Sequence, residues 1–171
     1  MTTGLLQFGL VTLALAGAAF AAEASDSSVS ASLRGLNEVP PTTSRATGTL
    51  HGHISDDNTS ISFTLTFENL TGNPAAAHIH FGPTKVNGGV MVFFCGGGGK
   101  PACPASTSGT VTGTITAADI VGPAAQGLPA APTGQFSDVL RAIRTGNGYA
   151  NIHTANFPAG EIRGQIATDE D

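Results

Sequence analysis

Two histidines lie one residue apart in a segment that has the pattern of a strand. His78 and His80 occur in the run Ala-His-Ile-His-Phe, residues 77–81. In an extended strand successive side chains point to opposite faces, so the two imidazoles share one face and Ile79 lies on the other. Imidazole is a common ligand of copper, zinc, iron and nickel. The pair therefore indicates part of a transition-metal site, and the alternative is a pair of solvated histidines without a ligand.

A third histidine, His153, falls in another strand-like segment near the C-terminus. Together with His78 and His80 it would supply the three nitrogens that an open copper or zinc site requires. Polar side chains on the ligand-bearing faces of the last two expected strands could support such a site; these are Asn151, Glu161 and Arg163. The alternative is that these residues and His153 form a polar network that only holds two strands together.

A second His-x-His pair, His51 and His53, is flanked by threonine and glycine. We interpret this pair as solvated. The sequence offers little for other chemistry: it has no G-x-S-x-G nucleophile motif. Its glycine run before Lys100 departs from a phosphate-binding loop, since Pro101 follows the lysine.

The composition favours an all-β domain with many turns. Only 11% of the residues are charged, and the chain contains 23 glycines and 10 prolines. Alternating or continuous apolar patterns predict strands at 29–33, 46–54, 61–67, 77–81, 90–94, 111–115, 149–154 and 161–167. Phe136, Val139, Leu140 and Ile143 have helical spacing and predict one short helix, with Ser137 as N-cap and Gly146 just after its end.

The N-terminal segment indicates export. Residues 1–22 resemble a secretory signal peptide with an A-x-A cleavage pattern at 19–21, although no Lys or Arg precedes the apolar run, so a membrane-anchored N-terminus is the alternative. We expect a flexible lead-in at 23–30, a single domain at 31–167 and an acidic tail at 168–171.

Cys95 and Cys103 are expected to form a disulfide, with soft metal ligation as the alternative. The net charge of −5 argues against binding to nucleic acid or to an anionic membrane.

Five motifs occur in an order that resembles the CHRD domain, first named in chordin. They are Leu-Asn-Glu-Val-Pro-Pro (36–41), Ala-His-Ile-His (77–80), Asn-Gly (87–88), Tyr-Ala-Asn-Ile-His-Thr (149–154) and Gly-Glu-Ile-Arg-Gly-Gln-Ile (160–166). The resemblance spans about Leu33 to Ile166. It implies a secreted, immunoglobulin-like, Greek-key antiparallel β-sandwich. It also implies the alternative function, an extracellular module that contacts a protein or a cell-surface polymer while its histidines are structural.

A weaker likeness is to the copper site of copper–zinc superoxide dismutase. His78, His80, His153 and Arg163 follow the order of its His-x-His strand, later histidine and C-terminal arginine. No histidine lies between His80 and His153, so the bridging imidazole and the zinc ligands of that enzyme have no counterparts. The likeness therefore supports copper rather than dismutase activity, and it does not by itself make the protein an enzyme.

Overall fold

The computed structural model describes Met1 and residues 28–169, which form nine antiparallel strands, one α-helix and three short 3-10 turns. The expected all-β fold with one short helix is confirmed. The strands are β1 (Ser28–Arg34), β2 (Thr47–Ile54), β3 (Ser60–Glu68), β4 (Pro74–Phe81), β5 (Gly89–Cys95), β6 (Gly109–Thr116), β7 (Gly148–Thr154), β8 (Ile162–Gln165) and β9 (Ala167–Thr168).

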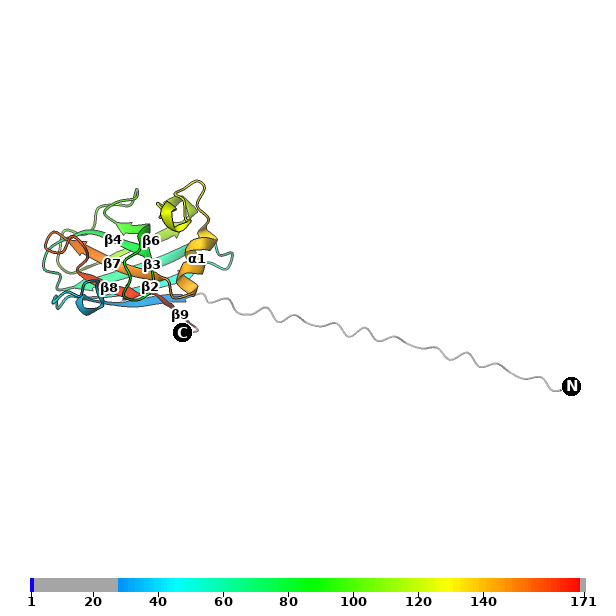
Figure 1. Cartoon of the computed structure of the whole chain (residues 1–171), viewed down its shortest axis with the longest axis horizontal. Coiled ribbons are helices and arrows are strands. Elements are labelled where there is room, and N and C mark those ends of the chain that lie inside the picture. Colours follow the sequence, from blue (N-terminus) through cyan, green and yellow to red (C-terminus); the bar gives the residue numbers. More distant parts are fainter. Residues whose placement is uncertain (2–27, 170–171) are drawn as a thin grey trace.

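Hydrogen bonds join the strands in one sheet, in the order β5-β4-β7-β8-β1-β2-β3-β6, with β9 beside β1 (Figure 1). A sandwich would divide these strands between two separate sheets. Here β1 pairs with β2 on one side and with β8 and β9 on the other, so it joins the two halves. The ends of the path, β5 and β6, approach each other. The result is a nearly closed, barrel-like sheet rather than the expected two-sheet sandwich.

Alternating side chains fill the interior of this sheet. In β3, Ile61, Phe63, Leu65 and Phe67 are buried, whereas Thr64 on the opposite face is exposed. This is the alternation that the sequence shows, because side chains of a strand point in turn to its two faces. Most of the buried apolar residues of the described strands belong to one core cluster.

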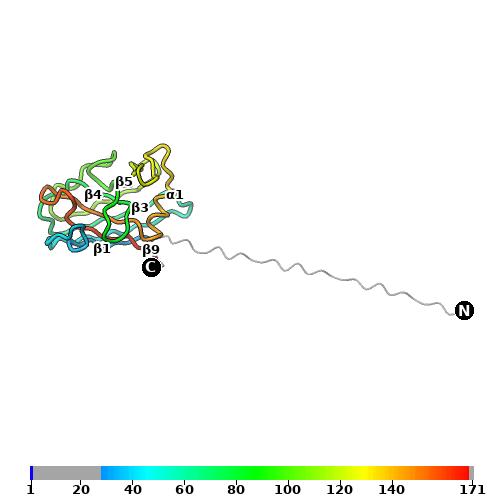
Figure 2. Tube along the Cα trace, viewed as in Figure 1, coloured from blue at the N-terminus to red at the C-terminus, as the bar shows by residue number. Residues whose placement is uncertain are grey.

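The helix α1 (Phe136–Arg144) lies across one end of the sheet (Figures 1 and 2). Its residues Val139, Leu140 and Ile143 are buried, as their helical spacing predicts. The expected N-cap is wrong: Gln135 occupies that position, and Ser137 lies in the first turn. Gly146 follows the helix with φ of 68°, a conformation that suits glycine, so this part of the prediction is confirmed.

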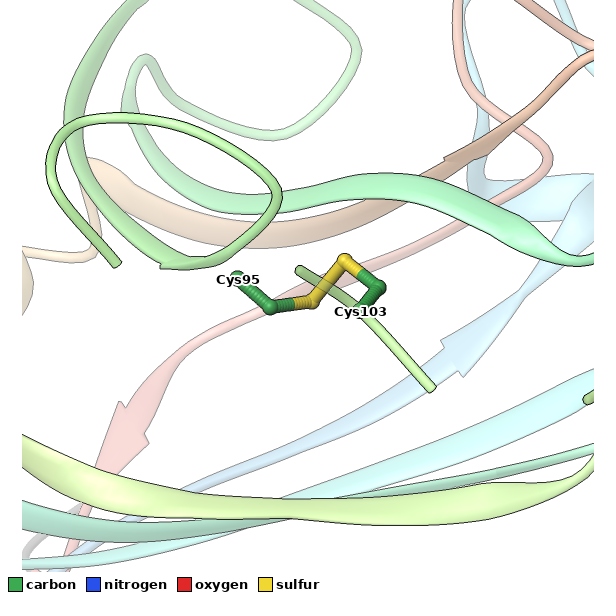
Figure 3. Close-up of a disulfide and its surroundings, with 2 residues drawn as sticks. All are labelled: Cys95 and Cys103. Carbon is green, nitrogen blue, oxygen red and sulfur yellow. A yellow bond between two sulfur atoms is a disulfide. The ribbon is translucent and has the colours of Figure 1, made fainter. Parts of the chain in front are cut away.

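The predicted Cys95–Cys103 disulfide is present and links the end of β5 to the loop that follows (Figure 3). Closing so short a loop stabilises the fold by about 2.5 kcal/mol in the chain-entropy model. Lys100, inside the loop, forms an ion pair with Asp119 at 2.8 Å and donates a hydrogen bond to the Thr114 carbonyl. The loop is thereby attached to the free edge of β6.

The domain limits differ slightly from those expected. Ser28 to Ser30 belong to β1 and pair with β2, so the flexible lead-in cannot extend to residue 30. Thr168 pairs with Val29, which places it in the domain rather than in an acidic tail. The predicted signal peptide, residues 1–22, lies outside the described residues apart from Met1. Within the described residues, no helix has the length and apolar character needed to span a membrane.

Candidate metal centre

The register of β4 against β7 brings the three predicted histidines together. His78 lies opposite Asn151, and His80 opposite Tyr149, which places His153 diagonally beside His78 on the same face. One nitrogen from each of the three imidazoles lies within 4.8 Å of the others. The Nδ1 of His78 and the Nε2 of His80 are only 3.3 Å apart. The structure therefore brings the three predicted histidines together in a cluster that could hold a metal ion.

Backbone carbonyls orient two of these imidazoles. The Nδ1 of His80 lies 3.0 Å from the carbonyl of Gly88, and the Nδ1 of His153 lies 3.0 Å from the carbonyl of Pro158. A carbonyl only accepts, so each Nδ1 carries the proton and each Nε2 keeps its lone pair. The Nε2 of His153 is buried and has no hydrogen-bond partner. This arrangement leaves an acceptor nitrogen that a metal ion would satisfy.

Aromatic side chains enclose the cluster. Phe93 of the neighbouring β5 packs edge-on against His78, with ring centroids 4.4 Å apart. Tyr149 stacks on His80, with centroids 4.7 Å apart and nearly parallel rings. Because of this packing His78 is only 7% exposed, while His80 and His153 are half-buried. The two aromatic rings thus shield His78 and His80 from solvent.

Burial keeps all three imidazoles neutral at physiological pH. Desolvation, followed by the proximity of His153 and His80, lowers the pKa of His78 from 6.5 to about 3. Desolvation also lowers the pKa of His80 to about 4, against the opposing effect of the Gly88 carbonyl. The pKa of His153 is lowered for the same main reason. Neutral imidazole is the form that coordinates a metal.

Arg163 lies on the other side of Tyr149 from His80, since β8 and β4 flank β7 on opposite sides. Its guanidinium carbon is 3.3 Å from the centroid of the Tyr149 ring. It donates hydrogen bonds to the carbonyls of Pro83 and Val86, both at 2.9 Å. Arg163 thus fixes Tyr149 and the loop after β4, which supports the histidines indirectly.

Asn151 contacts a residue that the sequence-based site did not include. Its Nδ2 donates to the buried carboxyl of Glu38, at 2.5 Å. Burial raises the pKa of Glu38 from 4.5 to about 7, although the Arg163 charge and two hydrogen bonds oppose the shift. Gly160 packs so closely on this pair that a Cβ there would lie 2.6 Å from Glu38 Oε1. The one sequence feature that pointed to a role for Glu38 in this site is its place in the Leu-Asn-Glu-Val-Pro-Pro motif.

Glu161 supports a different part of the structure from the one we expected. It is fully buried, and its carboxylate accepts hydrogen bonds from Ser44 Oγ, from the Thr71 amide and hydroxyl, and from Thr154 Oγ1, at 2.7–3.0 Å. These partners belong to the segment before β2, the loop before β4 and the end of β7. Glu161 therefore joins three segments of the fold, and its oxygens are directed to these donors rather than to the histidines.

His51 and His53 are exposed on β2, as predicted. Their strand lies three strands away from β7 in the order of the sheet, so they do not join the cluster. Among the described residues, one group of at least three potential ligands could hold a metal ion, and it consists of His78, His80 and His153.

The fold and this cluster define a class of small β-rich domain that carries a buried three-histidine group on the outward face of its sheet. The family model of the CHRD domain matches residues 29–166, which is well over half of the chain. The chain belongs to the CHRD family. No curated protein matches it, and nothing in the comparisons supports the likeness to the copper site of superoxide dismutase.

Proposed function

We propose that this CHRD domain binds a transition-metal ion, with copper as the preferred metal, through His78, His80 and His153. The observation that carries the proposal is the convergence of three neutral imidazole nitrogens within 4.8 Å of one another. Neutral nitrogens aligned by carbonyl hydrogen bonds are typical of metal-binding histidines. Their partly buried position also protects an ion from exchange with solvent ligands.

The spacing of the nitrogens fits a metal ion after small rotations of the side chains. A metal–nitrogen distance of about 2.0–2.1 Å places two ligands of a tetrahedral site about 3.4 Å apart. His78 Nδ1 and His80 Nε2, at 3.3 Å, already meet this spacing. The most separated pair of ligand atoms, at up to 4.8 Å, must approach by about 1.4 Å to do so. A rotation of the half-buried side chain of His80 or His153 would supply such a movement.

Copper is favoured over zinc by the chemistry of the ligands. Affinity for nitrogen ligands generally rises to copper and falls again at zinc, so three imidazoles should prefer divalent copper unless the protein enforces a tetrahedral site. The supporting groups are the carbonyls of Gly88 and Pro158, together with Tyr149 stacked on His80. We assign no catalytic role to the site.

We further propose that the protein acts outside the cytoplasm. The Cys95–Cys103 disulfide supports this location, because such bonds persist mainly in oxidising compartments. The apolar leader is the second argument, and it rests on sequence alone. Intact-mass measurement of the protein collected from a secreting host should show loss of about the first 22 residues. A mass that retains the leader would refute cleavage.

Calorimetric titration of untagged, metal-stripped protein with copper at pH 7 tests the metal proposal. We expect one copper per chain in the wild type, with zinc bound more weakly. His78→Ala and His153→Ala should each weaken binding by at least about 100-fold, since each removes one of three ligands. The matched control is the double variant His51→Ala/His53→Ala, which removes two exposed imidazoles and should retain wild-type affinity.

The alternative interaction module predicts a different result. On that view the histidines are structural, and no stoichiometric metal binds to the wild type. Binding that only the His51→Ala/His53→Ala variant loses would also contradict the proposal. Thermal unfolding of each variant without metal distinguishes loss of a ligand from loss of the fold.

A further inference from the structure

A cavity of about 470 Å³ lies outside the metal centre, between the loop that follows β1 and the loop that follows β4. Asn87 joins the two loops by donating to the Val39 carbonyl at 2.9 Å. The cavity is lined by Leu36, Asn37, Glu38, Val39, Pro41, Thr84, Lys85, Arg163 and Gln165. Its volume is in the range of small-ligand sites.

The lining combines an apolar rim with a polar, buried interior. Leu36 is 76% exposed, which is unusual for a large apolar side chain, and Val39 and Pro41 extend the apolar part of the lining. Leu36 is one of the few large apolar side chains exposed on the described part of the domain. Glu38 and Arg163, by contrast, are 4% and 2% exposed. A ligand would therefore place an apolar group near Leu36 and a polar group toward Arg163.

Positive charge dominates the polar part of the cavity. Neither Arg163 nor the exposed Lys85 forms an ion pair with any described residue. Arg163 uses three donor contacts, to Pro83, Val86 and Asn87, although a guanidinium has five N–H groups. The Glu38 carboxyl has its pKa raised to about 7 by burial, so its negative charge near neutral pH is only partial. An anionic group of the ligand would complement these two cations.

A buried acceptor in the lining adds a second requirement. The Nε2 of Gln165 donates to the carbonyls of Gly82, Gly146 and Gly148, which fixes the orientation of the amide. Its Oε1 is then buried without a hydrogen-bond partner. Buried acceptors without partners are costly, and an N–H donor on a ligand would satisfy this oxygen.

We propose that this cavity binds the C-terminus of a partner polypeptide that ends in an aliphatic residue. A terminal leucine offers the three groups together: a carboxylate for Lys85 and Arg163, an amide N–H for Gln165, and an aliphatic side chain for the apolar rim. A fatty acid would supply the carboxylate and the chain but no N–H donor. This site would serve protein interaction, and it does not depend on the metal proposal.

The tetrapeptide Ala-Ala-Ala-Leu is a suitable probe, titrated into the full domain in the presence of EDTA and followed by amide chemical shifts. We expect saturable shifts at residues 36–41 and 84–85. The same peptide with an amidated C-terminus, or with serine in place of the terminal leucine, should bind at least about 10-fold more weakly, as expected for a lost charge-assisted contact or a lost apolar contact. EDTA keeps the result separate from metal binding.

Variants at exposed positions test the assignment without endangering the core. Leu36→Asp should weaken binding at least about 10-fold, because it replaces the apolar contact by a repelling carboxylate. Lys85→Asn should weaken it about 5-fold, and asparagine tolerates the positive φ of this residue, 66°. Matched controls away from the cavity, Val121→Asp and Arg45→Asn, should bind like wild type.

Three results would overturn the inference: no binding of the free-acid peptide, equal binding of its amide, or unchanged binding in both cavity variants. Binding of N-acetyl-leucine without binding of the tetrapeptide would exclude a polypeptide ligand as well, since the cavity would then accept only the small molecule.

Discussion

The metal-free protein should lose stability as the pH falls from 7 to 5, because three buried imidazoles resist protonation in the folded state. A histidine whose pKa is lower in the folded than in the unfolded chain destabilises the fold once the pH falls below the unfolded value of 6.5. The folded values are about 3 for His78 and about 4 for His80. The pKa of His153 is also lowered and acts in the same direction.

Glu38 opposes this loss. Its pKa is raised from 4.5 to about 7, so the folded protein takes up a proton before the unfolded chain does, and stability increases between pH 7 and pH 4.5. Each group contributes at most about 1.4 kcal/mol per pH unit within its own range. Between pH 7 and pH 5, His78 and His80 together lower the free energy of unfolding by up to about 4 kcal/mol, and Glu38 raises it by up to about 3 kcal/mol. The expected net loss is about 1–2 kcal/mol, increased by His153.

Urea unfolding in EDTA at pH 7, 6 and 5 measures this balance. The decisive variant is Glu38→Gln, which keeps the shape of the side chain but removes its titration. Its stability should fall by about 3 kcal/mol more than that of the wild type over this range. A Glu38→Gln variant whose stability follows pH as in the wild type would refute the reasoning.

Two buried charges on the last hairpin give the remaining predictions. Arg163→Ala should cost about 3 kcal/mol, because it removes three hydrogen bonds and the contact with Tyr149, whereas Arg45→Ala, at an exposed position, should change stability by less than about 0.5 kcal/mol. Equal melting temperatures would show that Arg163 acts only as a surface charge. Glu161→Gln should cost about 2–3 kcal/mol, since an amide group would face hydrogen-bond donors, and the exposed control Glu68→Gln should be neutral. Chemical denaturation of each variant and its control measures these differences in stability. An unchanged denaturation midpoint for Glu161→Gln would contradict the role of Glu161 in joining the three segments.

Local patterns in the sequence were sufficient to predict most of the strands and the strand faces on which the histidines lie. Strict alternation in segments such as residues 61–67 determines which side chains are buried, and that periodicity is visible in the sequence. The shared face of His78 and His80 follows from the same rule. Their meeting with His153 depended on one assumption that local patterns do not supply, that β4 and β7 are neighbours, and the register of the two strands shows that they are.

Longer-range features were not accessible in this way. The continuous sheet depends on pairing of β1 with strands on both sides, and local patterns carry no information about such partners. The role of Glu161 was misjudged because strand parity placed it beside Arg163, whereas it precedes β8 and directs its carboxylate to Ser44, Thr71 and Thr154. Glu38 was missed as a site residue because it lies in a loop, where no periodicity predicts burial.

The outward face of β4, β7 and β8 carries polar residues, yet its central residues are buried, because the loop of residues 82–88 contacts them. The Gly88 carbonyl accepts from His80, and the Gly88 amide donates to the Tyr149 hydroxyl. A Cβ on Gly88 would collide with the backbone of Phe81, so glycine is needed for this close approach. The carbonyls of Pro83 and Val86, in the same loop, hold Arg163 at the cavity. One loop therefore contacts both the histidine cluster and the cavity, so both proposed sites lie on this face rather than on the exposed Ser/Thr-rich face of β2 and β3.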